Sequence, residues 1–420
     1  MTECDILIIG GGPAGSTAAA TLAGRGRDVV LLEKSRHPRF HIGESLLPLN
    51  TAIFDRLGIR DRVAAIGVHK PGAEFVSDTT GKAVQFSFAE GLDRTYPSSW
   101  QVERAGFDEM LFRTAQERGA MALEGMRVTD VTFGRERARV EAVDEVGNAT
   151  GFAARFVVDA SGRDTFLAGR SGTKRANKQN NSASVYGHFR GVERRTGALE
   201  GYISVHLAED GWFWLIPLPG DVMSVGFVGT PSAFKGRRGG AYEMLMQRIA
   251  QSPTVAARMR DASLIAEVSG TGNYSYDAEC ASGDGYLMVG DAFAFLDPVF
   301  SSGVLLAMTS GEMGAGVAEA WLESPARGRV AAAAMEREIR HAMGRLGWLV
   351  DRINDPALRL LFMNPANRLR MRDGLVSLLA GNLRGQRDQV VPVLAFKSAY
   401  YVARGLLRAG LLKPPVRTAV

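Results

Sequence analysis

The stretch Asp5-Ile-Leu-Ile-Ile9-Gly10-Gly-Gly12-Pro-Ala-Gly15 sets the fold of this 420-residue chain. The apolar residues that follow Asp5 predict a strand buried on both faces, and the alanine-rich residues 16–24 predict a helix. Residues 28–33 have the apolar composition of a second buried strand. Strand, glycine turn, helix and strand in this order indicate a βαβ unit that opens a parallel sheet.

The glycine turn and the end of the second strand have the spacing of a dinucleotide site. Glycines at these positions allow a tight turn and let a pyrophosphate approach the helix N-terminus. An acidic residue at the end of the second strand accepts hydrogen bonds from ribose hydroxyls and disfavours a 2′-phosphate. The residues predicted to bind the dinucleotide are Gly10, Gly12, Pro13, Ala14, Gly15, Glu33 and Lys34.

The rest of the chain alternates between sheet and helix. Strands are predicted within residues 72–100, 127–143, 156–159, 182–228 and 285–290, a helix over 101–119, and helices from 302 onward. We therefore predict a mixed α/β fold with three parts. A Rossmann-like domain comprises residues 1–70, 101–170 and 272–325. An inserted antiparallel-sheet substrate domain comprises 71–100 and 171–271, and a helical C-terminal region comprises 326–420.

Composition narrows the setting in which the protein works. Apolar residues make up 46% of the chain and charged residues 23%, which is the balance of a globular protein. Cys4 and Cys280 are too few for a disulfide framework or a four-ligand metal site, and the six histidines lack metal-ligand spacing, so no metal is predicted. The N-terminus lacks a signal-peptide pattern and no uninterrupted apolar run reaches 18 residues. These features predict a cytoplasmic protein without a transmembrane segment.

The positive charge of the chain lies in its C-terminal part. Residues 331–420 hold 15 of the 50 Lys and Arg but only 6 of the 45 Asp and Glu. Interleaved aromatic residues and a nucleic-acid reader motif are both missing, so no nucleic-acid partner is predicted. A docking face for an acidic partner and ordinary solvated helix faces both remain open.

Three later elements indicate FAD as the dinucleotide. They are Asp159-x-x-Gly162 after a strand, Gly290-Asp291 after another strand, and Arg104 in Gln101-Val-Glu-Arg104. Each alone is compatible with a turn aspartate, a strand-end carboxylate or a surface arginine. In this order they resemble the flavoproteins related to aromatic hydroxylases and glutathione reductase. The resemblance implies FAD contacts at Arg104, Asp159, Gly162 and Asp291.

The segment Gly211-Trp212-Phe-Trp214-Leu-Ile-Pro217 narrows the class further. It matches the GWxWxIP motif and resembles the flavin-dependent halogenase family over roughly residues 3–380. The alternative is that both indoles belong to the core of a strand. The resemblance implies that Trp212 and Trp214, with Pro217, form a wall that keeps an organic substrate away from the flavin. Only a small species such as a halide would then reach the flavin.

The same resemblance implies three further functional positions. Gly43-Glu-Ser45-Leu-Leu-Pro is similar to the loop that lies against the flavin, which adds Gly43 and Ser45 to the cofactor site. Asp297-Pro-Val-Phe-Ser-Ser302-Gly303 is similar to the halide loop, where Ser302 and Gly303 would bind chloride or bromide. Ser302 can equally be a helix N-cap. Lys70 takes the place of the catalytic lysine that receives hypohalous acid and presents it to the substrate.

One position departs from the pattern of the tryptophan halogenases, and the role of a second position stays open. Tryptophan halogenases have a glutamate just before the halide loop, whereas this chain has Phe300. The difference implies a more activated substrate, such as a phenol or a pyrrole, free or tethered to a carrier protein. Asp277 occupies a setting in which some relatives link flavin covalently, and an ordinary loop carboxylate is the alternative.

The sequence as a whole predicts an FAD-dependent halogenase of natural-product biosynthesis. It would take reduced flavin from a partner flavin reductase and use oxygen and chloride or bromide to form hypohalous acid, which halogenates an electron-rich aromatic. The main alternative is a flavin monooxygenase or oxidase on the same scaffold without halogenation. A non-catalytic flavin-binding accessory protein that docks a partner through the basic C-terminal part is the third.

Overall fold

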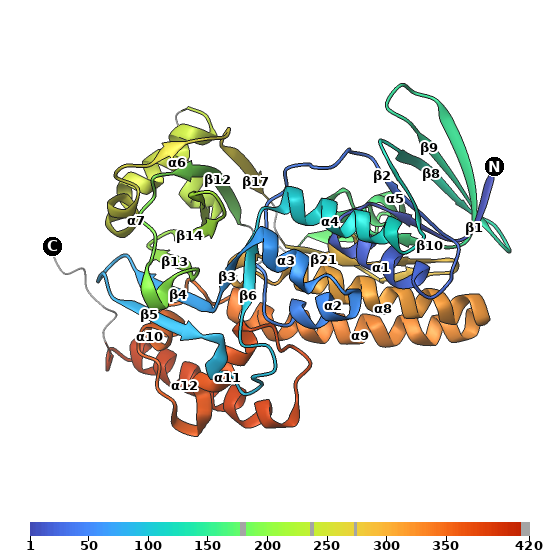
Figure 1. Cartoon of the computed structure of the whole chain (residues 1–420). Coiled ribbons are helices and arrows are strands. Elements are labelled where there is room, and N and C mark those ends of the chain that lie inside the picture. Colours follow the sequence, from blue (N-terminus) through green and yellow to red (C-terminus); the bar gives the residue numbers. More distant parts are fainter. Residues whose placement is uncertain (177–181, 236–238, 273–274, 413–420) are drawn as a thin grey trace.

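A mixed sheet with a parallel centre forms the first part of the molecule (Figure 1). The structure, a computed structural model, describes residues 1–176, 182–235, 239–272 and 275–412. The strands of this sheet lie in the order β19-β20-β10-β1-β2-β7, and a hairpin of β8 and β9 extends β10. Their bounds are β1 Thr2–Ile9, β2 Val29–Glu33, β7 Met121–Glu124, β8 Arg127–Phe133, β9 Ala138–Val143, β10 Ala149–Asp159, β19 Ser282–Gly283 and β20 Tyr286–Met288.

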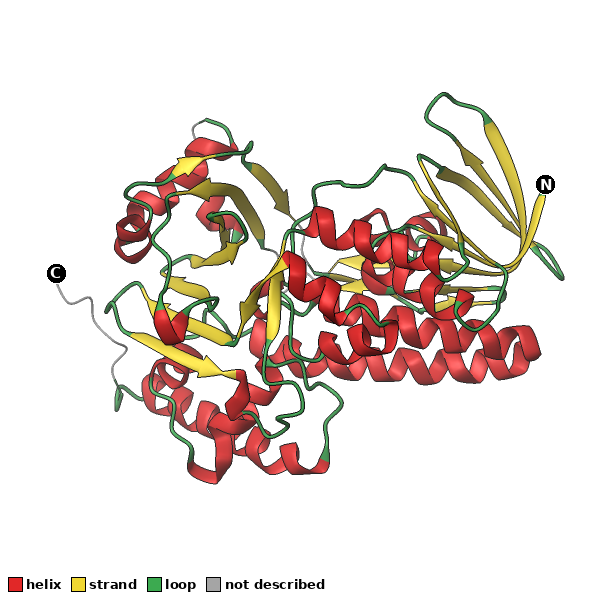
Figure 2. Ribbon diagram, in the orientation of Figure 1, coloured by secondary structure: helices red, strands yellow, loops and turns green. Residues whose placement is uncertain are grey.

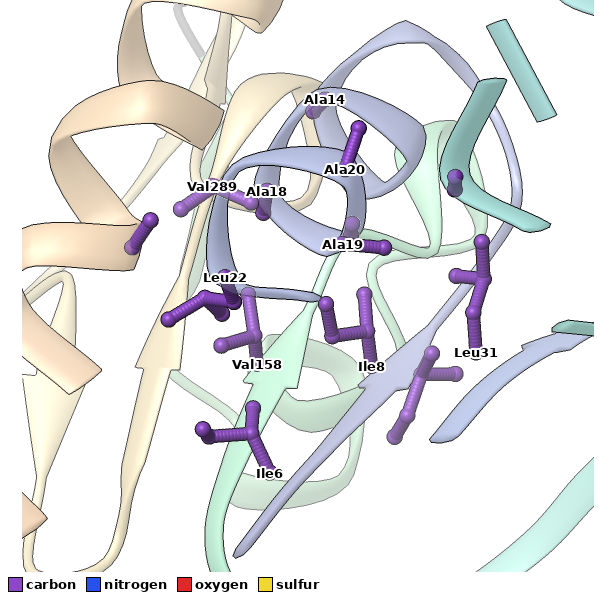
Figure 3. Packing of buried hydrophobic residues seen from close by; sticks show 14 of the residues in the cluster. Ile6, Ile8, Ala14, Ala18, Ala19, Ala20, Leu22, Leu31, Val158 and Val289 are labelled. Atoms are coloured by element: carbon purple, nitrogen blue, oxygen red, sulfur yellow. The ribbon is translucent and has the colours of Figure 1, made fainter. Parts of the chain in front are cut away.

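Helix α1 (Pro13–Ala23) lies directly on this sheet, as Figure 3 shows. Small side chains such as Ala18 and Ala19 face Ile8 and Val158 from the strands, so the helix can approach closely. Helix α8 (Gly303–Glu323) packs against α1, and a Cβ at Gly311 would lie only 2.3 Å from the carbonyl oxygen of Ala14. The other helices around this part are α2 Asn50–Leu57, α3 Arg60–Ile66, α4 Arg104–Glu117 and α5 Phe166–Ser171.

The second part is a twisted sheet in the order β16-β12-β15-β14-β13-β4-β5, with β17 also paired to β12. All of its pairs are antiparallel except β13–β4, which is parallel. Strand β4 comes from a separate segment before residue 100, so no tight hairpin joins it to β13. The predicted antiparallel sheet is therefore corrected at this one pair. The bounds are β4 Gly72–Ser77, β5 Ala83–Ser87, β12 Ala183–Arg190, β13 Ile203–Ala208, β14 Gly211–Leu218, β15 Val222–Gly229, β16 Ser263–Leu264 and β17 Ser269–Gly272.

Each face of the second sheet has its own cover. Phe213, Leu215 and Phe227 pack under α6 (Ala241–Gln251) and α7 (Pro253–Arg258). Trp212 and Trp214 point to the opposite face, where the C-terminal helices pack. Figure 2 shows these two groups of helices on either side of the strands.

A two-stranded ribbon of β3 (Gly67–Lys70) and β6 (Ser99–Val102) lies between the two sheets (Figure 1). Residues 43–48, which we name the strap, run beside β6, and Ser45 pairs with Gln101 across an antiparallel bridge. The predicted helix over 101–119 therefore begins only at Arg104, because Gln101 and Val102 belong to β6. A further small sheet contains β11 Lys174–Ala176, β18 Tyr276–Ala278 and β21 Ala294–Phe295.

The C-terminal part is helical, as predicted, with α9 Pro325–Val350, α10 Pro356–Met363, α11 Met371–Leu379 and α12 Arg387–Arg408. Helix α9 contributes to both parts of the molecule. Met335 and Ile339 near its middle belong to the core of the first sheet, while Leu346 and Leu349 belong to the core beneath the second sheet. The predicted boundary at residues 325/326 lies at the start of this shared helix.

Helix α12 bears on the expectation that the chain has no transmembrane segment. Its 22 residues reach a mean hydropathy of 1.3 over an 18-residue window, of which 22% is buried, so by length and composition it could cross a membrane. It contains no uninterrupted apolar run of 18 residues, because charged residues such as Lys397 and Arg404 lie within it. In the folded chain Phe396 and Tyr400 of α12 are buried in the core beneath the second sheet.

Candidate active site

A cavity of about 590 Å³ lies at the carboxyl ends of β1, β2 and β10 and extends to β14. Ligands of open α/β sheets bind at this end of the strands. The cavity brings together most of the residues predicted from the sequence. Those that line it are Gly10, Gly12, Pro13, Ala14, Glu33, Lys34, Gly43, Ser45, Arg104, Gly162, Trp212, Trp214, Asp291 and Gly303.

Five predicted residues lie outside the cavity lining, namely Gly15, Asp159, Pro217, Ser302 and Lys70. Gly15 and Asp159 shape the loops instead. A Cβ at Gly15 would lie 2.0 Å from the carbonyl oxygen of Gly10, and the Asp159 carboxylate accepts hydrogen bonds from the backbone N–H groups of Ser161 and Leu167. Pro217 lies beyond the last β13 partner of β14, where a missing N–H costs no ladder hydrogen bond.

The glycine loop has room for a ligand at Gly12. A Cβ there would meet only the Arg39 side chain, at 3.7 Å, so the protein itself does not require glycine at this position. Gly12 is the N-cap of α1, where backbone N–H groups point outward. This open cradle fits the pyrophosphate of a dinucleotide.

Glu33 closes the cavity beside this loop. Its carboxylate accepts hydrogen bonds from the N–H groups of Gly11 at 2.7 Å and Ser35 at 2.9 Å. Each oxygen retains a further lone pair, so the group can also accept ribose hydroxyls. Lys34 beside it forms an ion pair with Asp164 at the same end of the cavity.

Arg104 is held at the base of the cavity by a bidentate contact with Asp108, at 2.7 and 3.0 Å. A third nitrogen donates to the carbonyl oxygen of Ile42 in the loop before the strap. Burial alone would raise the pKa of Asp108, but Arg104 and Arg39 outweigh it and hold that pKa below its usual range. The charge of Arg104, together with burial, lowers the pKa of His41 to about 4, so this imidazole is neutral.

Arg39 and Glu44 line the cavity but were not predicted. Arg39 reaches both Glu33 and Asp108, at 3.5 and 3.3 Å. Glu44 accepts a hydrogen bond from His188 of β12 at 2.6 Å, which ties the strap to the second sheet. Arg39 belongs to no motif, so no local signal indicates it, whereas Glu44 lies inside the motif of the strap, which is a signal for it.

Asp291 lies on the other side of the cavity in the turn that follows β20. Burial raises its pKa to about 6, against the opposing charges of Arg104 and Arg163. A carboxyl group with this pKa can accept or donate a hydrogen bond near neutral pH. The FAD contact that the resemblance implies for Asp291 stays a prediction.

The tryptophan pair forms one wall of the cavity. Trp212 and Trp214 of β14 are almost fully buried, with ring centroids 5.9 Å apart. The Trp214 indole donates to the Ser224 hydroxyl at 3.1 Å and lies over Gly226, where a Cβ would come within 2.2 Å of the ring. Glycine at 226 therefore leaves the space that this indole occupies.

Lys70 lies at the end of β3 and is 1% exposed. Its ammonium donates to the carbonyl oxygen of Leu46 in the strap at 2.8 Å and lies 5.2 Å from the centroid of the Phe88 ring. Burial lowers the pKa of Lys70 to about 7. A large share of this side chain is thus a neutral, nucleophilic amine near neutral pH.

This burial predicts a pH-dependent stability effect. Folded Lys70 loses its proton near pH 7, whereas the unfolded side chain does so near 10.5, so between these values the unfolded chain binds more protons and stability rises with pH. The Tm of Lys70→Met minus the Tm of wild type should therefore fall as the pH rises from 7 to 10, because only the wild type gains this stability. Calorimetry over this range tests it, with the exposed Lys82→Met as control; a constant difference for Lys70→Met would contradict it.

The predicted halide residues lie at the start of α8. Gly303 lines the cavity, and Ser302 beside it is buried and forms no side-chain cap, so the N-cap alternative lacks its hydrogen bond. Phe300 is buried and stacks on Phe362 of α10, with ring centroids 6.2 Å apart. Phe300, where the chain departs from the expected pattern, thus belongs to the core beneath the second sheet.

Asp277 lies on β18, outside the cavity lining, and pairs with Arg340 of α9 at 2.8 Å. This contact supports the alternative of an ordinary structural carboxylate. The neighbouring Tyr274 lies outside the described residues. Within residues 1–176, 182–235, 239–272 and 275–412, no cluster of three or more His, Cys, Asp or Glu could hold a metal.

Comparison with known proteins identifies the class. The model of the FAD-binding domain family matches residues 3–310. The solved structure of a flavoprotein/dehydrogenase from Cytophaga hutchinsonii superimposes with a TM-score of 0.85 at 29% identity, covering 96% of this chain and 99% of that one. The fold and the cavity thus define an FAD-binding flavoprotein, and the predicted fold class and cofactor are confirmed.

Curated relatives identify the family. Tryptophan 2-halogenase from Chondromyces crocatus is 35% identical over 311 residues, which cover 73% of this chain and 59% of the relative. A 1H-pyrrole-2-carbonyl-(peptidyl-carrier protein) brominase from Pseudoalteromonas luteoviolacea is 33% identical over 316 residues, covering 73% of this chain and 75% of the relative. The chain belongs to the flavin-dependent halogenase family, although it spans less than two thirds of the length of the first of these relatives.

Proposed function

We propose that this chain is an FAD-dependent halogenase of electron-rich aromatics in natural-product biosynthesis. Reduced FAD, oxygen, halide and a proton would yield oxidised FAD, water and hypohalous acid, which then replaces an aromatic hydrogen by halogen and releases water. Reduced FAD would come from a separate flavin reductase. The observation that supports this proposal most strongly is Lys70. It is buried, its pKa is lowered to about 7, it lies outside the lining of the flavin cavity, and its ammonium donates a hydrogen bond to the strap.

The chain's own residues would divide the work. The Gly12 cradle, Glu33 and Arg39 would bind the cofactor phosphates and ribose. Trp212 and Trp214 would exclude the organic substrate from the flavin, and Gly303 with Ser302 would bind the halide. Lys70 would hold and orient the hypohalous acid, an otherwise indiscriminate electrophile.

A coupled assay tests this proposal. The protein is supplied with a flavin reductase, NADH, FAD, oxygen and bromide or chloride, together with a simple phenol. We expect a product in which halogen has replaced hydrogen, and mass spectrometry separates it from an oxygenated product. A hydroxylated phenol would instead support the flavin monooxygenase alternative, and peroxide as the sole product in the presence of halide would support an oxidase.

We further propose that the aromatic substrate is attached to a carrier protein. The Pseudoalteromonas luteoviolacea relative is named for a substrate on a peptidyl-carrier protein. The basic C-terminal part suits an acidic carrier. Among its cations, Lys397 lies over the Trp348 ring and Arg404 contacts Asp355 at 3.4 Å, whereas Arg408 is exposed at the end of α12.

Arg408→Glu should therefore slow halogenation of a carrier-bound substrate at low salt by roughly tenfold, since electrostatic steering changes association rates by at least that factor. The loss should shrink as salt rises, and turnover of a free phenol should be unchanged. Arg135→Glu, in the exposed β8–β9 turn at the far end of the molecule, is the matched control (Figure 1). Equal rates for both variants on the tethered substrate would remove the support for docking at α12.

A further inference from the structure

Four buried polar side chains form a row that leads from the wall of the flavin cavity and ends with Lys70. The row starts at Ser45 in the strap, passes Gln101 and Ser99 on β6, and ends at Lys70 on β3. None of the four is more than 4% exposed. Ser45 is the member that lines the cavity, so the row leads from the cavity wall into the interior.

Strand register places all four side chains on one face. Ser45 lies opposite Gln101, in a bridge flanked by the bonds Leu46 N–H to Trp100 O and Val102 N–H to Glu44 O. Lys70 lies opposite Ser99 in the β3–β6 pair. Opposed residues, and residues two apart on one strand, share a face of a ribbon. The alternate residues Trp100 and Val102 belong to the core of the first sheet.

The hydrogen-bonding capacity of the row is only partly used. Lys70 donates to Leu46 O, Ser99 donates to Leu47 O, and the Gln101 amide nitrogen donates to Gly201 O at 3.1 Å. Within the described residues, Gln101 Oε1 and Ser45 Oγ have no hydrogen-bond partner. Buried polar atoms nearly always have one. The row therefore offers an acceptor and a hydroxyl, side by side, to a small molecule.

We propose that Gln101 and Ser45 bind hypohalous acid on its way from the flavin cavity to Lys70, an inference that rests on the proposed function. Hypohalous acid has one O–H donor and an accepting oxygen, which match Gln101 Oε1 and the Ser45 hydroxyl. An amide and an alcohol react with electrophilic halogen far more slowly than an amine does, so they can hold the acid without consuming it. Gln101 thus acts in transfer, and Lys70 is the first strong nucleophile along the row.

Two variants of Gln101 separate its acceptor from its bulk. Gln101→Met keeps the length but has no carbonyl, whereas Gln101→Glu, kept neutral by burial, retains an accepting oxygen and a donor for Gly201 O. The halogenated product formed per reduced flavin consumed should fall about tenfold in Gln101→Met, the usual effect of one lost hydrogen bond. Taurine in solution should capture the escaped acid. Gln101→Glu should recover most of the yield.

The control is Gln389→Met on α12, another fully buried glutamine, which accepts a hydrogen bond from Arg345. It should leave the yield and the rate of flavin oxidation unchanged, and flavin oxidation should also be unchanged in Gln101→Met. An unchanged yield in Gln101→Met, or the same loss in Gln389→Met, would overturn the proposal. So would a parallel loss of flavin oxidation and product in both Gln101 variants, because that indicates a structural role.

A second measurement does not depend on turnover. Crystals of the flavin-free protein soaked in hydrogen peroxide, which has similar donors and acceptors, should show a small molecule within about 3 Å of Gln101 Oε1 and Ser45 Oγ. The Gln101→Met crystal should lack it. A wild-type site that binds neither peroxide nor water would overturn the transfer role. If the site binds peroxide but wild type never halogenates, the proposed function fails instead.

Discussion

Lys70→Ala should abolish halogenation while flavin chemistry continues. The side chain lies outside the flavin cavity, so FAD binding and NADH-coupled consumption of oxygen should persist, and the oxidising equivalents should appear as peroxide or escaped hypohalous acid. Because the amine positions the electrophile, the yield of halogenated product should fall by roughly a hundredfold or more. Product and peroxide, measured together by mass spectrometry and a peroxidase-coupled assay, give the ratio.

Two further substitutions at this position separate the amine from its volume and its charge. Lys70→Met preserves the buried volume, and Lys70→Arg preserves the charge but cannot become neutral. Both should behave as Lys70→Ala does. Regioselective halogenation retained in Lys70→Met would show that Lys70 has no part in transfer, and full retention in Lys70→Arg would show that a neutral amine is not required.

Gly12→Val should remove FAD binding from a protein that still folds. The backbone at Gly12 is extended, at φ −77° and ψ −173°, and a side chain there meets only Arg39. The new side chain would instead occupy the cradle that fits the pyrophosphate, so FAD affinity should fall at least about a hundredfold, or roughly 2.7 kcal/mol. Titration of the flavin-free protein with FAD, followed by fluorescence, measures the loss, and Tm without flavin should match wild type.

Gly15→Ala is the contrasting variant in the same loop. Its Cβ would meet the carbonyl oxygen of Gly10 at 2.0 Å, so it should lower Tm even without flavin. Full FAD occupancy in Gly12→Val would contradict the cradle. Equal losses of Tm in both variants would show that Gly12 serves folding rather than the ligand.

The sequence was most informative where chemistry depends on local spacing. Short motifs contain Gly10, Gly12, Glu33, Asp291 and the two indoles of β14, and the structure places these residues around one cavity. The prediction for Lys70 depends on the resemblance to the halogenase family, because nothing local in the sequence indicates a buried lysine. Its neighbours in space, the strap carbonyl of Leu46 and the ring of Phe88, lie in separate segments of the chain.

Residues that act through long-range pairing could not be predicted. Gln101 was assigned to a helix because its pairing with Ser45 and Val68 depends on how the strap and β3 return to β6. Arg39 joins Glu33 to Asp108 across segments that meet only in the folded chain. The parallel pair β13–β4 likewise depends on two segments more than a hundred residues apart.

The shared helix α9 has a consequence for how the molecule unfolds. Its 26 residues pack Met335 and Ile339 into one core and Leu346 and Leu349 into the other, so neither core can lose its structure without uncovering apolar surface on the same helix. We therefore expect the flavin-binding and substrate parts to unfold as one cooperative unit rather than as two autonomous modules. A chain cut near residue 325 would leave both halves incomplete, and melting should proceed as a single transition in which the cofactor cavity and the Lys70 ribbon are lost together.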